Sequence, residues 1–273
     1  MGLFNFLSGK KKNKVPFGDA LENVEVQEGL ILPKAFANHW EEIKATALDY
    51  VEIIATPADK FTATESSFGS IPFFPTGFDY PMDGQGQPMI PLAQLNFAEM
   101  PAIEGYPTKG IVQFYIANTD TYGLDFDNHY NPDSFRVIYI EHPENMTVNP
   151  HTSFLDNVMK SEYSPVYKPH KLSFARKREY VGISDYRYNL HGFSIDSWYA
   201  GYSEEERNSL EDESYELFNT TGHKVGGYAN FAQEDPREYI KSGRHGYHKR
   251  FRGYFVPKMG NNQCWWWLLY YCK

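Results

Sequence analysis

The sequence predicts an α+β fold that is dominated by antiparallel β-sheet, with a few flanking helices. Aromatic residues make up 17% of the 273 residues, and large flat side chains pack well on pleated sheets. Prolines recur from Pro75 to Pro107, so no long helix forms in that stretch. Residues 111–116 and 135–140 are β-branched and aromatic runs typical of strands. Together these observations favour sheet over helix as the main component.

The first 29 residues predict a leader. A short apolar patch, residues 1–9, is followed by Lys10, Lys11 and Lys12. We interpret it as a solubilising leader, with weak contact to an anionic membrane surface as the alternative. Residues 33–46 then carry apolar side chains near helical spacing and predict one amphipathic helix. A strand follows at residues 51–54.

The stretch from residue 66 to 117 predicts a β-meander held by prolines. Residues 68–72 combine glycine and proline, which is turn chemistry at the mouth of a strand. Residues 83–86 form a polar, hairpin-like turn before an apolar run at 89–97. The strand at 111–116 completes the meander.

The next segment, residues 120–133, places carboxylates at alternate positions, as calcium-binding loops do. The helix-loop-helix calcium motif needs glycine at the position of Tyr130 and a closing glutamate at the position of Arg136, so neither requirement is met. We therefore expect an acidic solvated loop, with no metal and no cofactor; adventitious binding of a divalent cation is the alternative. The strand at 135–140 follows it.

The second half gives fewer signals. Residues 143–170 predict no clear element. Arg176, Lys177 and Arg178 form a basic cluster interrupted by Glu179, which is typical of a solvated edge or of partners for nearby acids. Residues 203–206 form a capping box, which predicts a helix that reaches about residue 218.

A short motif recurs half a chain apart. Residues 225–228 align with residues 68–71, because each has an apolar residue, a small pair and another apolar residue. Phe231 then falls under Phe74. This repetition predicts an internal duplication.

These motifs resemble the YwqG-like proteins, a bacterial family of unknown function. The resemblance is carried by ordered motifs across residues 33–237: the 68–72 turn, the 91–97 run, the 110–116 strand, the 122–125 turn and the 224–228 motif. It implies a cytoplasmic bacterial protein with a β-rich α+β fold built on a duplicated unit. It implies no established reaction.

The C-terminus departs from that family. Its members continue with a leucine-rich strand, an acidic turn and a Trp-Gly-Asp segment, whereas residues 264–273 read CWWWLLYYCK here. Repeated codons read out of frame give such runs, so we hypothesise a frameshift near Tyr247. The alternative is a genuine diverged tail. The predicted organisation is a leader at 1–29, a single body in two pseudo-repeated halves at 30–247, and an atypical tail at 248–273.

Charge and cysteine content limit the classes of partner. The formal net charge is −9, which argues against nucleic acid because phosphate binding needs a basic face. The only cysteines, Cys264 and Cys272, lie at the end of the chain, so no disulfide framework is expected. No apolar run is long enough to span a bilayer. We expect a cytoplasmic protein whose partner is a small molecule or another protein.

No sequence motif carries a known catalytic chemistry, so a non-enzymatic ligand- or protein-binding module is the main functional prediction. The predicted site combines neutral hydrogen-bonding groups, an anion-tolerant turn and a polar rim: Gln94 and Asn96; Lys224, Gly226 and Gly227; Gln233, Asp235 and Arg237.

Three alternatives stay open. In the first, the glycines serve tight turns, Gln94 and Gln233 satisfy buried backbone, and Asp235 pairs with Arg237. In the second, the protein is a hydrolase that uses an acid such as Asp79, Asp125 or Asp127 as general base. In the third, it is a self-assembling structural protein.

Overall fold

The computed structural model describes residues 19–125, 127, 131–191, 195–199, 201–231, 258–259 and 263–264. Every strand pairing within these residues is antiparallel. Sheet predominates over short helices, which confirms the predicted α+β class. No helix in this described part has both the length and the apolar character needed to cross a membrane.

The main sheet has seven strands in the order β7-β6-β5-β4-β8-β3-β9. In sequence order they are β3 (Leu48–Pro57), β4 (Ser67–Phe68), β5 (Ile90–Asn96), β6 (Ile111–Ile116), β7 (Phe135–Ile140), β8 (His170–Glu179) and β9 (Lys224–Gly226). Strands β4, β5 and β6 pair consecutively, as the meander predicted for residues 66–117 requires, and β7 extends it by one strand. Two further two-stranded sheets pair β1 (Asn23–Gln27) with β2 (Leu30–Pro33), and β10 (Lys258–Met259) with β11 (Gln263–Cys264).

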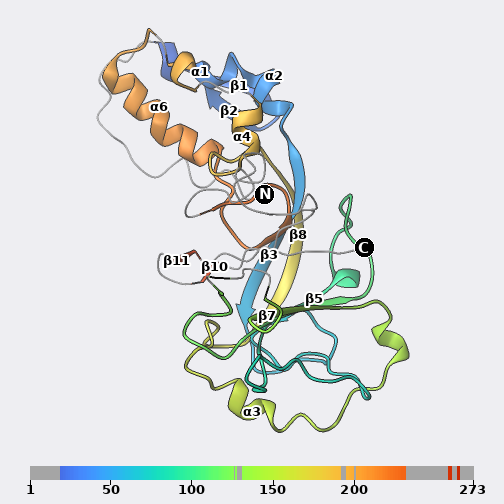
Figure 1. Ribbon diagram of the computed structural model, residues 1–273. Helices are drawn as coiled ribbons and strands as arrows, with labels where there is room; N and C mark the ends of the chain where they lie inside the picture. The colour runs from blue at the N-terminus through green and yellow to red at the C-terminus, as the bar shows by residue number, and fades with distance from the viewer. Residues whose placement is uncertain are drawn as a thin grey trace.

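The longest pairing joins β3 to β8 without interruption, from Leu48 opposite Glu179 to Pro57 opposite His170. Figure 1 shows these two strands side by side, linking a helix-rich end to an end that contains β5, β7 and α3. The sequence predicted only the middle of β3 and missed β8. Strand β8 carries charged side chains on both of its faces, so it lacks the alternation of apolar and polar residues by which strands are recognised.

The helices are short, apart from α6. They are α1 (Lys34–Ala37), α2 (Trp40–Lys44), α3 (Leu155–Val158), α4 (Arg187–Leu190), α5 (Ile195–Trp198) and α6 (Glu204–Leu217), with 3-10 turns η1 (Asp19–Leu21), η2 (Phe97–Glu99) and η3 (Pro143–Asn145). The single helix predicted at 33–46 is thus divided into α1 and α2. The division falls at His39, whose φ of −111° and ψ of 16° are not helical.

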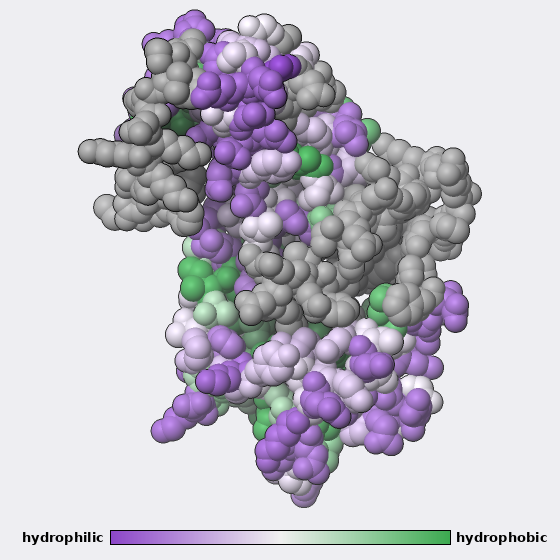
Figure 2. Space-filling model, turned by 90° about the vertical axis from the view of Figure 1, so that its left-hand side faces the viewer, coloured by the Kyte–Doolittle hydropathy of each residue, from purple (hydrophilic) through white to green (hydrophobic). Residues whose placement is uncertain are grey.

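Helix α6 begins as the sequence predicted. Ser203 Oγ accepts a hydrogen bond from the backbone N–H of Glu206, and the Glu206 carboxylate accepts one from the backbone N–H of Ser203. This capping box satisfies donors that the first helical turn leaves unpaired. In Figure 2, which views the molecule from the side of α6, the surface over the helix-rich end is mainly hydrophilic.

Two main cores lie at opposite ends of the β3–β8 pair. The core of the helix-rich end includes Phe36, Trp40, Ile43, Trp198 and Leu210, so it joins α1, α2, α5 and α6. The core of the other end packs the meander against α3 and contains these buried residues among others: Ile90, Leu95, Tyr115, Ile116 and Leu155. Strands β3 and β8 therefore connect the two cores, and β9 pairs with the first half of β3.

The two motif strands lie on opposite sides of the central pair. Strand β4 pairs with the first residues of β8, Phe68 opposite His170 and Ser67 opposite Lys171. Strand β9 pairs with the first half of β3, from Tyr50 to Glu52. Each short strand thus adds to the N-terminal part of a long strand, and each is followed by a glycine with positive φ.

Candidate functional site

The most unusual polar arrangement surrounds the turn at residues 226–229, which we call the glycine turn. Gly226 and Gly227 have φ values of +83° and +69°, a conformation that disfavours side chains. A Cβ on Gly226 would lie 2.8 Å from Ile103 Cδ1, and one on Gly227 would overlap the Glu179 carboxylate. The turn is therefore packed closely on both sides, which explains why the chain has two glycines here.

A buried ion pair lies against one side of the turn. Lys224 Nζ donates to both carboxylate oxygens of Glu179 at 2.7 Å. The two side chains are only 4% and 8% exposed. The sequence separates these residues by 45 positions, but β8 and β9 flank β3 on either side and bring them together. A buried pair with this geometry retains both charges only while each has the other.

Burial dominates the ionisation of this pair. It raises the pKa of Glu179 and lowers that of Lys224, while each partner opposes the shift of the other. Lys224 Nζ also lies 5.1 Å from the centroid of the Tyr50 ring. Burial, and then the negative charges of Glu179 and Glu52, raise the pKa of Tyr50 to about 12. Tyr50 therefore stays protonated at neutral pH.

A second acid and base hold the other end of the turn. Asp185 is 1% exposed, and its carboxylate accepts two hydrogen bonds from the Arg187 guanidinium, at 2.8 and 2.7 Å. The same carboxylate accepts the backbone N–H of Ala229 at 3.1 Å. Arg187 in turn donates to the carbonyl of Gly227 at 3.2 Å and lies 4.3 Å from the ring centroid of Tyr228.

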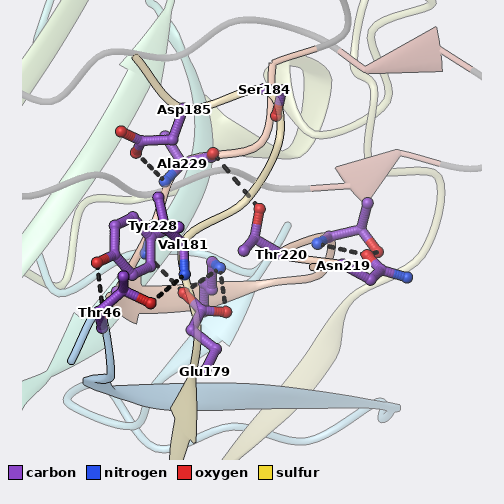
Figure 3. A network of polar contacts seen from close by, with 12 residues as sticks. Thr46, Glu179, Val181, Ser184, Asp185, Asn219, Thr220, Tyr228 and Ala229 are labelled. Atoms are coloured by element: carbon purple, nitrogen blue, oxygen red, sulfur yellow. Dashed lines mark hydrogen bonds and ion pairs between the residues drawn. The ribbon is translucent and has the colours of Figure 1, made fainter. Parts of the chain in front are cut away.

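Tyr228 connects the turn to the start of β3. Its backbone N–H donates to Glu179 at 2.6 Å, and its hydroxyl donates to the carbonyl of Thr46 at 2.5 Å. Thr46 Oγ1 accepts the backbone N–H of Val181 at 3.2 Å. Figure 3 shows Glu179, Asp185, Thr46, Tyr228 and Ala229 within this one network. Each carboxylate therefore fixes backbone donors of the turn as well as a cation.

The arrangement suits Glu179 and Asp185 to holding the backbone of the turn in place rather than to transferring protons. Both oxygens of Glu179 and both of Asp185 accept hydrogen bonds from the protein itself. Carboxylates in such complete networks rigidify a site. Among the residues that the structure describes, no group of three His, Cys, Asp or Glu side chains is placed to hold a metal ion.

The predicted residues Gln94 and Asn96 lie on β5 and bond to backbone. Gln94 is 2% exposed. It accepts the N–H of Phe73 at 2.7 Å and donates to the carbonyls of Ala63 and Glu65 at 2.9 Å. Asn96 accepts the N–H of Ala98 and donates to the carbonyl of Thr64. Both amides satisfy backbone groups of neighbouring segments.

The structure does not bring all the predicted residues together. Three strands separate β5, with Gln94 and Asn96, from β9, with Lys224. At about 4.8 Å per strand, four steps span about 19 Å. Lys224, Gly226 and Gly227 do form one unit. Gln233, Asp235 and Arg237 lie outside the described residues.

The residues that complete the network were not singled out from the sequence as site residues. Glu179, Asp185 and Arg187 lie outside every motif to which a site was assigned, and their partners in the turn are 40 to 49 positions away along the chain. The one available signal was the acid that interrupts the basic cluster at 176–178. A lone Glu beside three basic residues reads as a surface feature until the fold shows that it is buried.

The acids considered for hydrolysis lie elsewhere. Asp79 is exposed in the loop between β4 and β5. Asp125 accepts the N–H of Asp127 at 2.9 Å and an N–H from the side chain of Asn131 at 2.8 Å. These bonds fold the acidic loop on itself, as short polar side chains commonly do.

Comparison with protein families places the chain in a family. Residues 66–270 match the family model described as "Domain of unknown function (DUF1963)". The match begins at the residue before β4 and includes β8, β9 and the glycine turn, whereas β3 precedes it. A comparison with curated proteins gives no match. Since the matched region covers more than half of the chain, the protein belongs to the DUF1963 family.

Proposed function

We propose that this protein is a non-enzymatic module that binds a ligand or another protein, and that the glycine turn, whose Tyr228 and Ala229 are buried, is the rigid support beneath its binding surface. The observation that carries the proposal is the buried network beneath the turn. Glu179 and Asp185 accept the backbone N–H groups of Tyr228 and Ala229, and Arg187 donates to the carbonyl of Gly227. A backbone fixed in this way loses little entropy when a partner binds.

The predicted rim residues fit this role by their place in the sequence. Gln233, Asp235 and Arg237 begin four residues after Ala229, so they follow directly from the fixed turn. In this proposal these three residues supply the polar contacts to the ligand or partner protein. Lys224 supports the turn through its buried ion pair with Glu179. Gln94 and Asn96 are not part of this surface in the proposal, because Gln94 is buried and both amides bond to backbone.

The broader assignment follows from the resemblance to YwqG-like proteins. We propose a cytoplasmic bacterial protein whose body, residues 30–247, arose by duplication. Two features support this: the repeated glycine motif, and the similar pairing of β4 with β8 and of β9 with β3. In each pair, the short strand that carries the glycine motif of one half adds to the long strand of the other half. The tail at 248–273 would then stand in place of the end of the second copy.

Native mass spectrometry of the full chain, gently purified from bacterial cells, tests the binding role. We expect wild-type protein to carry an additional small molecule or protein, and Glu179→Gln to lose it. Glu52→Gln is the control, because Glu52 pairs with Lys177 at 2.7 Å on the same sheet but is partly exposed. Wild-type protein without any bound species would contradict the binding role. Retention of the species by Glu179→Gln would contradict the role of the turn.

A further inference from the structure

The basic cluster of β8 is divided between the two faces of the sheet. Alternation along a strand places Arg176 and Arg178 on one face and Lys177 on the other. The two arginine side chains are 55% and 65% exposed. Lys177 instead pairs with Glu52 at 2.7 Å. The three adjacent cations therefore belong to two different surfaces.

A single carboxylate holds both arginines. Asp49, opposite Arg178 in the β3–β8 pairing, accepts Arg178 Nε on one oxygen at 2.8 Å. Its other oxygen accepts Arg176 Nε at 3.2 Å and one terminal nitrogen of Arg176. The Asp49 side chain is 24% exposed. Asp49 thus fixes the two guanidinium groups beside each other, which lowers the entropic cost of using them together.

The Arg178 guanidinium is attached through its Nε alone. Within the described part of the chain, no hydrogen bond engages its two terminal nitrogens, which lie on a side chain that is 65% exposed. Arg176 is turned further inward, since a terminal nitrogen also contacts the carbonyl of Ala102 at 3.5 Å. Two planar donor groups, held by one carboxylate, therefore lie next to each other.

The local charge is positive although the protein is acidic overall. Two guanidinium groups face one carboxylate, whereas the whole chain has a formal net charge of −9. Arg178, and then Arg176, lower the pKa of Asp49, so the carboxylate remains charged at neutral pH and keeps both arginines in place. One positive charge is left over at this position.

We propose that Arg176 and Arg178, positioned by Asp49, form a binding site for a tetrahedral oxyanion, either free phosphate or the phosphate of a small phosphomonoester. Guanidinium groups donate paired hydrogen bonds to phosphate oxygens, and two of them reach more oxygens than one. This site lies on the face of β8 opposite Lys177 and Glu179, so it does not depend on the role proposed for the glycine turn.

Titration of the full-length protein with inorganic phosphate, followed by the arginine Nε–Hε resonances in NMR, tests the site. Sodium chloride at matched ionic strength controls for screening. We expect saturable shifts confined to two arginine resonances. A parallel titration with glycerol 3-phosphate distinguishes the sources: tighter binding of the ester assigns the site to phosphomonoesters, and equal or weaker binding assigns it to free phosphate.

Three variants make the test specific. Arg178→Gln should weaken phosphate binding about tenfold or more, as loss of a charge-assisted hydrogen bond predicts. Arg178→Lys keeps the charge but loses the planar donor group, so it should also weaken binding. Lys177→Gln removes the same charge from the opposite face and should change binding less than about twofold, because exposed charges are screened. Equal weakening by Arg178→Gln and Lys177→Gln, or shifts that do not saturate, would overturn the proposal.

Discussion

Replacing Lys224 by Met should destabilise the protein strongly. The substitution keeps most of the side-chain volume but removes the cation that both oxygens of Glu179 accept from at 2.7 Å. Glu179 would remain buried, and among the residues that the structure describes only the backbone N–H of Tyr228 would still donate to it. Breaking a buried pair in this way costs about 3–5 kcal/mol of the free energy of unfolding. That loss is a large fraction of the stability of an ordinary domain.

The chain supplies a matched control in Lys177→Met. Lys177 pairs with Glu52 at the same 2.7 Å distance and lies on the same sheet. Its side chain is 36% exposed, compared with 4% for Lys224. Exposed pairs contribute about 0–1 kcal/mol. The difference between the two losses in the free energy of unfolding therefore measures the effect of burial, because the residue type and the ion-pair distance are the same.

The pH dependence of Lys224→Met has a definite sign. Burial raises the pKa of Glu179, and loss of Lys224 removes a group that opposes this rise. The folded variant then binds a proton more readily than the unfolded chain, whose Glu pKa is about 4.3. Its stability relative to wild type should fall as the pH rises above that value. Adding Glu179→Gln to Lys224→Met should remove this dependence.

Urea unfolding followed by tryptophan fluorescence, with linear extrapolation, gives the required free energies. A cost of Lys224→Met no larger than that of Lys177→Met at pH 7 would show that burial does not strengthen the Lys224–Glu179 pair. A destabilisation of Lys224→Met that does not depend on pH would show that Glu179 does not titrate as expected in the variant. The slope with urea must match that of wild type, because a changed slope indicates an altered unfolding transition.

Three further predictions concern other parts of the fold. Gly227→Ala should cost at least about 1 kcal/mol more than Gly86→Ala in urea unfolding, since both have positive φ but only the first Cβ meets a buried group. Gln113→Leu should cost about 1–3 kcal/mol in the same assay, because it removes donors from two buried acceptors. Asp49→Asn should cost stability above about pH 4 and progressively less below it, because Arg178 lowers the Asp49 pKa and the folded pair is lost on acidification; thermal melts across this range measure the effect.

Each of these predictions has an outcome that contradicts it. Equal losses from the two glycine substitutions would mean that the Glu179 carboxylate moves aside without cost. A neutral Gln113→Leu would indicate that the surrounding backbone finds other partners. A difference between wild type and Asp49→Asn that grows on acidification would reverse the expected sign.

Several elements follow from sequence because their signals are local. Strands β6 and β7 match the predicted runs at 111–116 and 135–140, and the capping box of α6 needs only four residues. Each of these depends on side-chain shape, alternation or capping within a few positions. The antiparallel, β-dominated class follows in turn from such strands and from the prolines that exclude helix.

Strand β8 was not recognised because its pattern depends on partners far along the chain. Arg176 and Arg178 bond to Asp49 on one face, and Lys177 bonds to Glu52 on the other. Cross-strand ion pairs at sequence separations above 120 residues make a charged strand stable in the middle of a sheet. Within β8 only Leu172 and Phe174 alternate with polar residues, and the charged half that follows has the composition of a solvated segment.

The candidate site divides in the same way. The sequence predicts a tight turn at residues 226 and 227 and groups Lys224 with it, because turn chemistry is local. The partner of Lys224 could not be predicted in the same way. The pairing of β3 with both β8 and β9 buries its ammonium group against Glu179, which is 45 positions away along the chain. Burial and charge pairing are properties of the assembled sheet, which no short stretch of the chain contains.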